Sequence, residues 1–474
     1  MIKRNTILRG LIIPVLLGSL GLGGCTLAPK YTRPAAPVPA RWPAGPAYQG
    51  TQSAEAVPAA DLKWREFFTD PHLQSVIRMA LVNNRDLRLA ALNVERARAV
   101  YGIQRAELFP ALDAAGSYVR QRVPADLSTT GSSMTANQYN VNLGVTAWEI
   151  DFFGRIRSLK DAALEQYFAT DQARRSAQIL LISNTAIAWH TLAADRENLK
   201  LSRSTLEAQE ASYKLIRKRY DLGMASELDL RRAQSQVDAA RGDVARYMQF
   251  AAQDENALNL LAGSRVPPEL LPPDLTGIAV PKEVTAGLSS EVLLRRPDVL
   301  AAEHQLKAAN ANIGAARAAF FPRISLTAAF GTASADLSGL FKAGSGAWNF
   351  APSAVMPIFD ARVWSAYDVT KTDRDIAVAQ YEKTIQSAFR EVANALAVKG
   401  TVNQQIAAQE SLVGALAEAY RLAVLRYNRG IDSYLSVLDA QRSLYGAQQG
   451  MIGLQLSRVT NLVSMYAVLG GGVD

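Results

Sequence analysis

Hydrophobic residues recur every seven positions in two stretches of the chain, and the second stretch repeats the first 212 positions later. The first seam consists of Leu73, Ala80, Leu87, Val94, Tyr101 and Leu108, and the second of Val292, Val299, Leu306, Ile313 and Phe320. A sustained seven-residue repeat is typical of a coiled coil. Each stretch therefore predicts one long helix, with an amphipathic helix in a globular core as the alternative. Each predicted helix ends at a Phe-Pro pair, because proline interrupts the helical hydrogen bonds.

After each Phe-Pro pair the period of the pattern changes to two. Alternating apolar and polar positions predict strands of about ten residues over 112–120, 138–147, 323–331 and 348–358, joined in pairs by loops rich in Gly, Ser and Thr. Strands of this length fit a membrane β-barrel; soluble hairpins on an exposed sheet are the alternative. Four strands are too few to close a barrel. The pattern therefore predicts an oligomer, in which three chains supply twelve strands.

A longer helical stretch follows each pair of strands. It covers residues 155–219 in the first copy and 363–426 in the second, and neither stretch contains proline. At 1.5 Å per residue each predicted helix is about 95–100 Å long, which is far too long for a globular domain. Turns containing glycine, over 220–226 and 427–433, then reverse the chain into a shorter helix.

The chain is therefore an internal duplication. Around the first turn, eight residues recur 207 positions later: Tyr213, Arg219, Tyr220, Gly223, Ser226, Leu228, Ala233 and Gln234. We divide the sequence into repeat 1 over 63–263, a proline-containing linker over 264–284 and repeat 2 over 285–474. The segment 25–62 precedes them, and its seven prolines predict an extended strap.

The N-terminus has the features of a secretory signal over residues 1–24, with a basic start and an apolar stretch. It ends in Leu22-Gly23-Gly24-Cys25, which resembles the bacterial lipoprotein box, so we expect Cys25 to carry covalent lipid. An ordinary signal followed by an incidental cysteine is the alternative. Thr26 follows, and by resemblance to bacterial lipoproteins the lack of Asp there favours sorting to the outer membrane.

Composition argues against several classes of protein. Cys25 is the only cysteine, so no disulfide is expected, and three scattered histidines (His72, His190 and His304) make a metal site improbable. Removing the three basic residues of the signal takes the formal net charge from +8 to +5, and no basic tract indicates nucleic acid. No spacing pairs a carboxylate with a histidine or a nucleophile, so we expect neither an enzyme nor a cofactor beyond the lipid. A structural coiled-coil lipoprotein would lack the alternating strands.

Five further motifs, in order along the chain, carry a family resemblance. They are Trp64-Arg65-Glu66-Phe67-Phe68, Asn84-Arg85-Asp86-Leu87, Trp148-Glu149-Ile150-Asp151-Phe152-Phe153-Gly154-Arg155, Arg295-Arg296-Pro297-Asp298 and Leu438-Asp439-Ala440-Gln441-Arg442. Together with the lipoprotein box and the twofold repeat, they resemble the TolC-like outer-membrane efflux factors, in the OprM-like lipoprotein branch. The resemblance covers essentially all of the mature chain.

The resemblance implies an α+β membrane protein that forms a homotrimer. Its twelve-stranded outer-membrane β-barrel, four strands per chain, would continue into a twelve-helix periplasmic α-barrel, with a mixed equatorial belt built from the N-terminal segment, the linker and the C-terminal region. It implies a passive exit duct for drugs and other small toxic compounds in a Gram-negative outer membrane. The implied partners are a periplasmic adaptor and an inner-membrane transporter of the resistance-nodulation-division type. A duct for type I protein secretion or metal efflux is the alternative.

A permanently open duct would leak, so we expect a gate at the periplasmic turns, where the two copies differ. Asp229 and Arg232 in the first copy correspond to Ser436 and Asp439 in the second. In a trimer, three Asp439 carboxylates would form a ring that attracts cations, and Leu435 would add an apolar constriction. The resemblance supports both rings.

Opening is expected as an iris-like shift of the inner helix pair when the adaptor docks. A solvated charge or a packing tyrosine is the alternative for each gate position. The candidate gate residues are Leu435, Asp439, Arg426, Tyr427, Asp229 and Asp221, and the candidate adaptor-docking residues are Gly223, Ser226, Gly430 and Ser433.

Overall fold

The computed structural model describes residues 26–49, 59–287 and 289–471, so the signal and Cys25 lie outside the described residues. The chain forms two compact units. Unit 1 comprises Met1–Ala35, Val94–Thr170 and Ala302–Tyr381, and unit 2 comprises Ala36–Asn93, Asp171–Ala301 and Glu382–Asp474. Each unit takes segments from both sequence repeats. The boundaries of the two compact units therefore do not coincide with the boundaries of the two sequence repeats.

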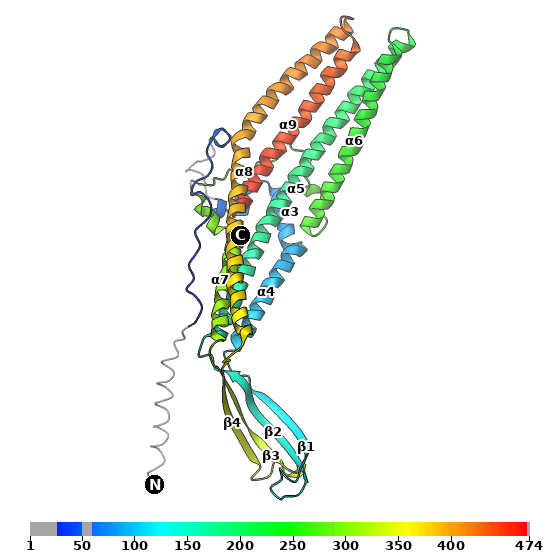
Figure 1. Cartoon of the computed structure of the whole chain (residues 1–474). Coiled ribbons are helices and arrows are strands. Elements are labelled where there is room, and N and C mark those ends of the chain that lie inside the picture. Colours follow the sequence, from blue (N-terminus) through cyan, green and yellow to red (C-terminus); the bar gives the residue numbers. More distant parts are fainter. Residues whose placement is uncertain (1–25, 50–58, 288, 472–474) are drawn as a thin grey trace. The chain divides into compact units, whose positions relative to one another are not determined.

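Unit 1 contains a four-stranded antiparallel sheet in the order β1-β2-β3-β4 (Figure 1). The strands are β1 (Asp113–Val123), β2 (Met134–Glu149), β3 (Arg323–Ser334) and β4 (Gly346–Val355). All four predicted strands are present, although β2 and β3 are longer than predicted and β4 ends earlier. Within the described part of the chain, β1 and β4 each pair on one side only, so a single chain leaves both sheet edges open.

The alternation predicted for β2 is wrong at its end. The pairing of β2 with β3 shifts between Val145 and Trp148, and Ala147 has a φ of 51°. The backbone N–H of Ala147 donates to Thr327 Oγ1 at 3.1 Å. A β-bulge inserts an extra residue and so reverses the alternation beyond it, which a strict period of two does not anticipate.

Two very long helices follow the strand pairs, as the sequence predicted. They are α5 (Arg155–Asp221), with 67 residues, and α8 (Ala361–Asn428), with 68 residues. At 1.5 Å per residue each is about 100 Å long. The chain passes between the units after Ala35, within these two helices, and within α4 (Arg85–Ala106) and α7 (Pro297–Ala318). Among the described residues, no helix combines the length and the apolar character needed to cross a membrane.

The first seven-residue stretch is not one helix, which corrects the prediction. Helix α3 (Pro71–Asn83) ends at Asn84, whose backbone is extended. The Asn84 Oδ1 accepts a hydrogen bond from the Leu87 N–H at 3.0 Å, and its Nδ2 donates to the Leu261 carbonyl at 3.0 Å. Asparagine is a strong N-cap residue, so it starts α4 as a separate helix.

The second copy breaks 212 positions later, at Arg296. This residue is extended, as the residue before a proline tends to be. Val292 therefore lies in the 3₁₀ helix η4 (Ser290–Arg295) and not in α7, contrary to the predicted seam. The Arg296 guanidinium bonds Asp298, Glu391 and the Val468 carbonyl, so the break is tied to both α8 and the C-terminal helix.

The core of unit 2 joins the N-terminal segment, the linker and the C-terminal region, as expected for the equatorial belt. Phe67, in α2 (Trp64–Phe67), stacks on Tyr466 with ring centroids 4.3 Å apart, and the Tyr466 hydroxyl donates to the Leu62 carbonyl at 3.0 Å. Trp189 of α5 donates its Nε1–H to the Leu270 carbonyl of the linker at 3.0 Å. These aromatic side chains are almost completely buried.

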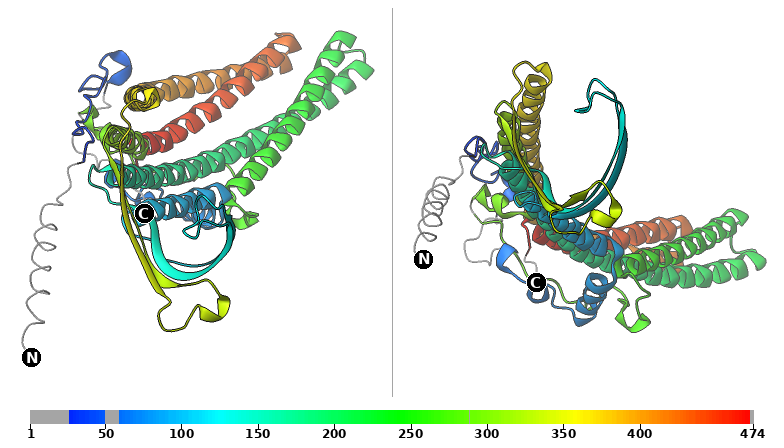
Figure 2. Two further views of the ribbon diagram at one scale, coloured as in Figure 1. Left: turned by 60° about the horizontal axis from the view of Figure 1, so that its bottom comes forward. Right: turned by 90° about the horizontal axis from the view of Figure 1, so that it is seen from below.

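Two helical hairpins complete unit 2. The C-terminal part of α5 turns back into α6 (Glu227–Ala262), and the C-terminal part of α8 turns back into α9 (Tyr434–Val468). The two hairpins lie side by side in all views (Figures 1 and 2).

Candidate gate at the helical tips

The turns at the two tips share one backbone conformation. Gly223 and Gly430 both have a φ of 73°, in the left-handed region that favours glycine. The Met224 N–H donates to the Arg219 carbonyl at 2.7 Å, and Ile431 donates to Arg426 at 3.0 Å in the same way. These bonds close the helix ends in the manner of a Schellman motif. Both predicted turns are therefore tight reversals.

The two serines that follow the turns are not equivalent. Ser226 caps α6: its Oγ accepts a hydrogen bond from the Asp229 N–H at 3.1 Å and donates to Asp229 Oδ2 at 2.7 Å. Ser433 occupies the same position before α9 but makes no capping bond with its side chain. Asp229 thus takes part in the hydrogen bonds that cap the N-terminus of α6.

A small apolar core holds the two tips together. Its buried members come from both hairpins: Ile216, Leu230, Ala233, Tyr434, Val437 and Leu438. Tyr213, Tyr420 and Tyr427 pack against it. Burial raises the pKa of Tyr434 to about 12, so this hydroxyl is neutral at physiological pH. We call this set the tip core.

Arg426 forms an ion pair that the sequence analysis missed. Its Nε and Nη2 donate to the two carboxylate oxygens of Asp432 at 2.6 and 2.9 Å. The hydrogen bond from Arg426 holds the pKa of Asp432 below its ordinary value. The sequence does contain a signal for this ion pair. The first copy has Ala225 beside its turn, whereas the second copy has the acidic residue Asp432 at the corresponding position.

Tyr427, at the second tip, contacts residues of both tips. Its ring lies 5.3 Å from the ring of Tyr434, and the Cζ of Arg219 from the first tip lies 4.9 Å from the Tyr427 centroid. A guanidinium at this distance over an aromatic face is in cation–π contact. The equivalent arginines of the two copies therefore have different partners, an aromatic ring for Arg219 and a carboxylate for Arg426.

The remaining candidates are exposed in a single chain. Leu435 is 41% exposed, outside the tip core. Asp439 approaches only Arg442 on its own helix, at 3.5 Å, and Asp221 approaches Arg217 at 3.4 Å. The structure pairs Arg426 with Asp432 and not with Asp221 or Asp229. No described group of three or more His, Cys, Asp or Glu side chains is arranged to hold a metal ion.

The open sheet and the paired helical hairpins define a TolC-like outer-membrane channel. The chain belongs to the outer membrane efflux protein family, whose model matches residues 76–264 and 288–471. It is 52% identical over 452 residues to the toluene efflux pump outer membrane protein TtgC of Pseudomonas putida, covering 95% of this chain and 93% of TtgC. It is 44% identical over 469 residues to the outer membrane protein OprJ of Pseudomonas aeruginosa, covering 98% and 96%.

A solved structure agrees with this assignment. The open state of the Neisseria gonorrhoeae MtrE outer membrane channel is 40% identical, covers 95% of this chain and 99% of MtrE, and has a TM-score of 0.85. The family resemblance drawn from the motifs is confirmed. The chain is the outer-membrane channel component of an efflux pump.

Proposed function

We propose that three copies of this chain form the passive exit duct of a tripartite efflux pump, anchored in the outer membrane by lipid on Cys25. The observation that carries the trimer is the open sheet. Edge strands β1 and β4 present unpaired backbone groups, which lipid cannot satisfy. Pairing β4 of each chain with β1 of the next would close the barrel, and three chains supply the twelve strands.

The two faces of the sheet support this arrangement. On one face Leu143 lies opposite Phe330, which lies opposite Trp348, and these three side chains are 55%, 72% and 77% exposed. On the other face Asn142 lies opposite Gly331, which lies opposite Ala347. A large apolar face suits contact with lipid, and a face of small and polar side chains suits a water-filled lumen.

The tips support the proposed gate. We assign the constriction to Leu435 and Asp439, because both are exposed on α9 and free to meet their copies across a threefold axis. The ion pair between Arg426 and Asp432 and the contact of Arg219 with Tyr427 would stabilise the closed tip. The adaptor would dock on the turns, at Gly223, Ser226, Gly430 and Ser433, and shift the second hairpin.

The cargo and the remaining partners follow from the family. The name of the toluene efflux relative supports small organic compounds as cargo. Such a duct contains no energy source of its own, so it requires an inner-membrane transporter, which we propose is of the resistance-nodulation-division type, and a periplasmic adaptor.

The test combines two measurements on the purified full-length protein. The mass in detergent is expected to be that of a trimer, and planar-bilayer recordings are expected to show discrete channel openings. A monomer that conducts nothing would refute the proposed duct. Mass spectrometry of the mature N-terminus would show whether Cys25 carries lipid, and a Cys25→Ser variant provides the control.

A further inference from the structure

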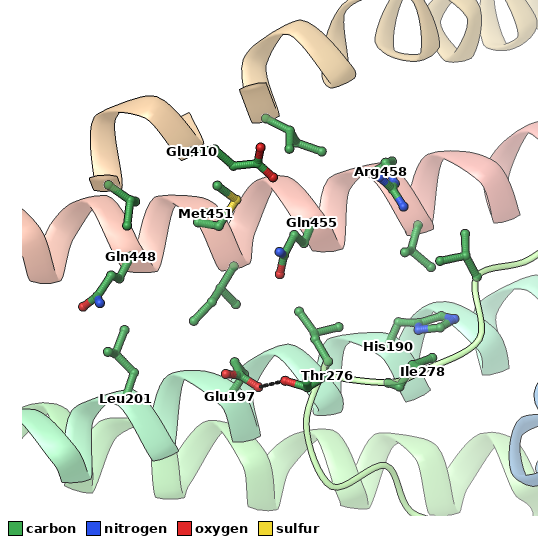
Figure 3. A pocket seen from close by; sticks show the side chains of 16 residues that line it. His190, Glu197, Leu201, Thr276, Ile278, Glu410, Gln448, Met451, Gln455 and Arg458 are labelled. Carbon is green, nitrogen blue, oxygen red and sulfur yellow. Dashed lines mark hydrogen bonds between the residues drawn. The ribbon is translucent and has the colours of Figure 1, made fainter. Parts of the chain in front are cut away.

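Unit 2 contains a cavity of about 490 Å³ that the gate does not use (Figure 3). It lies among α5, α8, α9 and residues 275–280 of the linker. Cavities of this size hold drug-sized molecules in other proteins. Much of the wall is apolar: Leu201, Ile278, Val413, Met451, Ile452 and Val459.

The cavity contains a buried polar group without a partner. His190 is completely buried, and neither ring nitrogen makes a hydrogen bond within the described part of the chain. Burial lowers the pKa of His190 to about 4, so the ring is neutral near pH 7 and offers one N–H donor and one acceptor nitrogen. Because both ring nitrogens are inaccessible to water, the imidazole lies behind the wall of the cavity and does not offer a hydrogen bond to a molecule inside it.

The charged side chains of the wall are acidic in balance. Glu197 of α5, Glu410 of α8 and Arg458 of α9 line the cavity (Figure 3). With a neutral histidine these groups sum to a formal charge of −1. Glu197 accepts a weak hydrogen bond from the Thr276 hydroxyl at 3.3 Å. The nearby Lys200 also attracts Glu197, but its ion pair is with Asp274, at 2.9 Å. A ligand with a positive charge therefore suits the glutamate end better than an anion does.

We propose that this cavity binds a drug-sized cationic amphiphile. Its amine lies beside Glu197 and Glu410, and its apolar body lies against Ile278 and Met451. Because α5 belongs to the first hairpin and α8 and α9 to the second, the bound molecule contacts both hairpins. The proposal rests on the cavity alone and does not depend on the assignment of the gate.

The test titrates the full-length protein in lipid nanodiscs with rhodamine 6G, a fluorescent cationic amphiphile, and follows its anisotropy. Saturable binding is expected. The double variant Glu197→Gln/Glu410→Gln is expected to bind about tenfold more weakly, since two partly exposed ion pairs contribute up to about 1 kcal/mol each. Glu207→Gln is the matched control: Glu207 is exposed on α5 outside the cavity, so binding should be unchanged.

A further variant and a second dye separate a specific site from general adsorption. Met451→Trp fills the cavity and should abolish saturable binding. Binding that survives both Met451→Trp and the double glutamate variant would overturn the proposal. The anionic dye 8-anilinonaphthalene-1-sulfonate should bind more weakly than rhodamine 6G. Tighter binding of this anion, abolished by Met451→Trp, would overturn the assigned charge.

Discussion

The two helical tips share a backbone but differ in what their side chains hold. Gly223 and Gly430 close both turns in the same left-handed conformation. Arg219 of the first tip reaches over Tyr427 of the second, whereas its equivalent Arg426 is held locally by Asp432. The difference follows from one position, which is Ala225 in the first copy and Asp432 in the second. The two copies thus share the same backbone turn, but their equivalent arginines bind different partners.

A second difference between the copies, at positions 227 and 434, determines how the two tips pack together. Tyr434 is buried in the tip core, where the first copy has Glu227, which is exposed. The second hairpin therefore supplies the largest buried side chain of the tip core, and residues of both hairpins pack around it. Four experiments would break or sharpen this comparison.

The largest effect is expected from Tyr434→Ala. Removing a buried aromatic side chain costs about 3–5 kcal/mol through lost contacts and the cavity left behind. The measurement is the free energy of unfolding of the tips by native-state hydrogen exchange. The matched control is Glu227→Ala, which should change that free energy by less than about 0.5 kcal/mol. Equal effects of the two changes would contradict the placement of Tyr434 in the tip core and of Glu227 at the surface.

The next effect concerns conduction. Arg426→Ala and Asp439→Ala are each expected to raise single-channel conductance in planar bilayers severalfold, because the first would release the second tip and the second would remove the proposed carboxylate ring. Asp221→Ala, on the first tip, is the comparison and should have a smaller effect. Unchanged conductance in both Arg426→Ala and Asp439→Ala would show that the gate lies elsewhere.

The pH response tests the ion pair between Arg426 and Asp432. Because the pKa of Asp432 is lowered by Arg426, the pair is fully formed above the ordinary carboxyl pKa near 3.8 and is lost only as pH falls through the lower folded value. Conductance attributable to this pair should therefore be the same at pH 7 and pH 5. A rise at pH 5 that disappears in Asp432→Asn would contradict the assignment.

The smallest effect is expected for the contact between Arg219 and Tyr427. A double-mutant cycle with Arg219→Gln and Tyr427→Leu should give a coupling of about 0.5–1 kcal/mol, the range for an exposed cation–π pair. The observable is again hydrogen exchange at the tips. Introducing Ala225→Asp should draw Arg219 to a local partner and reduce this coupling toward zero.

Periodicity in the sequence predicted most of the fold, because periods of 3.5 and 2 report directly which face of a helix or strand is apolar. The long helices α5 and α8 and the four strands were found in this way. The breaks at Asn84 and Arg296 were missed because the apolar seam continues across them while capping and a following proline end the helix. The bulge at Ala147 left no mark in the alternation.

The candidate site was predicted less completely than the fold. The copies were compared at Asp229 and Arg232 but not at Ala225, so Asp432 was overlooked although the same comparison would have found it. His190 was considered only as a possible metal ligand. Its burial and the cavity beside it depend on how the linker packs on α5, α8 and α9, which no local pattern in the sequence encodes.

The offset of 207 residues between the copies is constant around the two turns, and the paired helices differ by only one residue in length, which limits how this protein can change. Helices α5 and α8 have 67 and 68 residues, and α6 and α9 have 36 and 35. One residue inserted into one arm would rotate everything beyond it by about 100° and misalign the tip core. The offset between copies falls from 212 to 207 across the strands, so variation in length has accumulated in the strand hairpins instead. The two hairpins can therefore become longer or shorter only if both copies gain or lose the same number of residues.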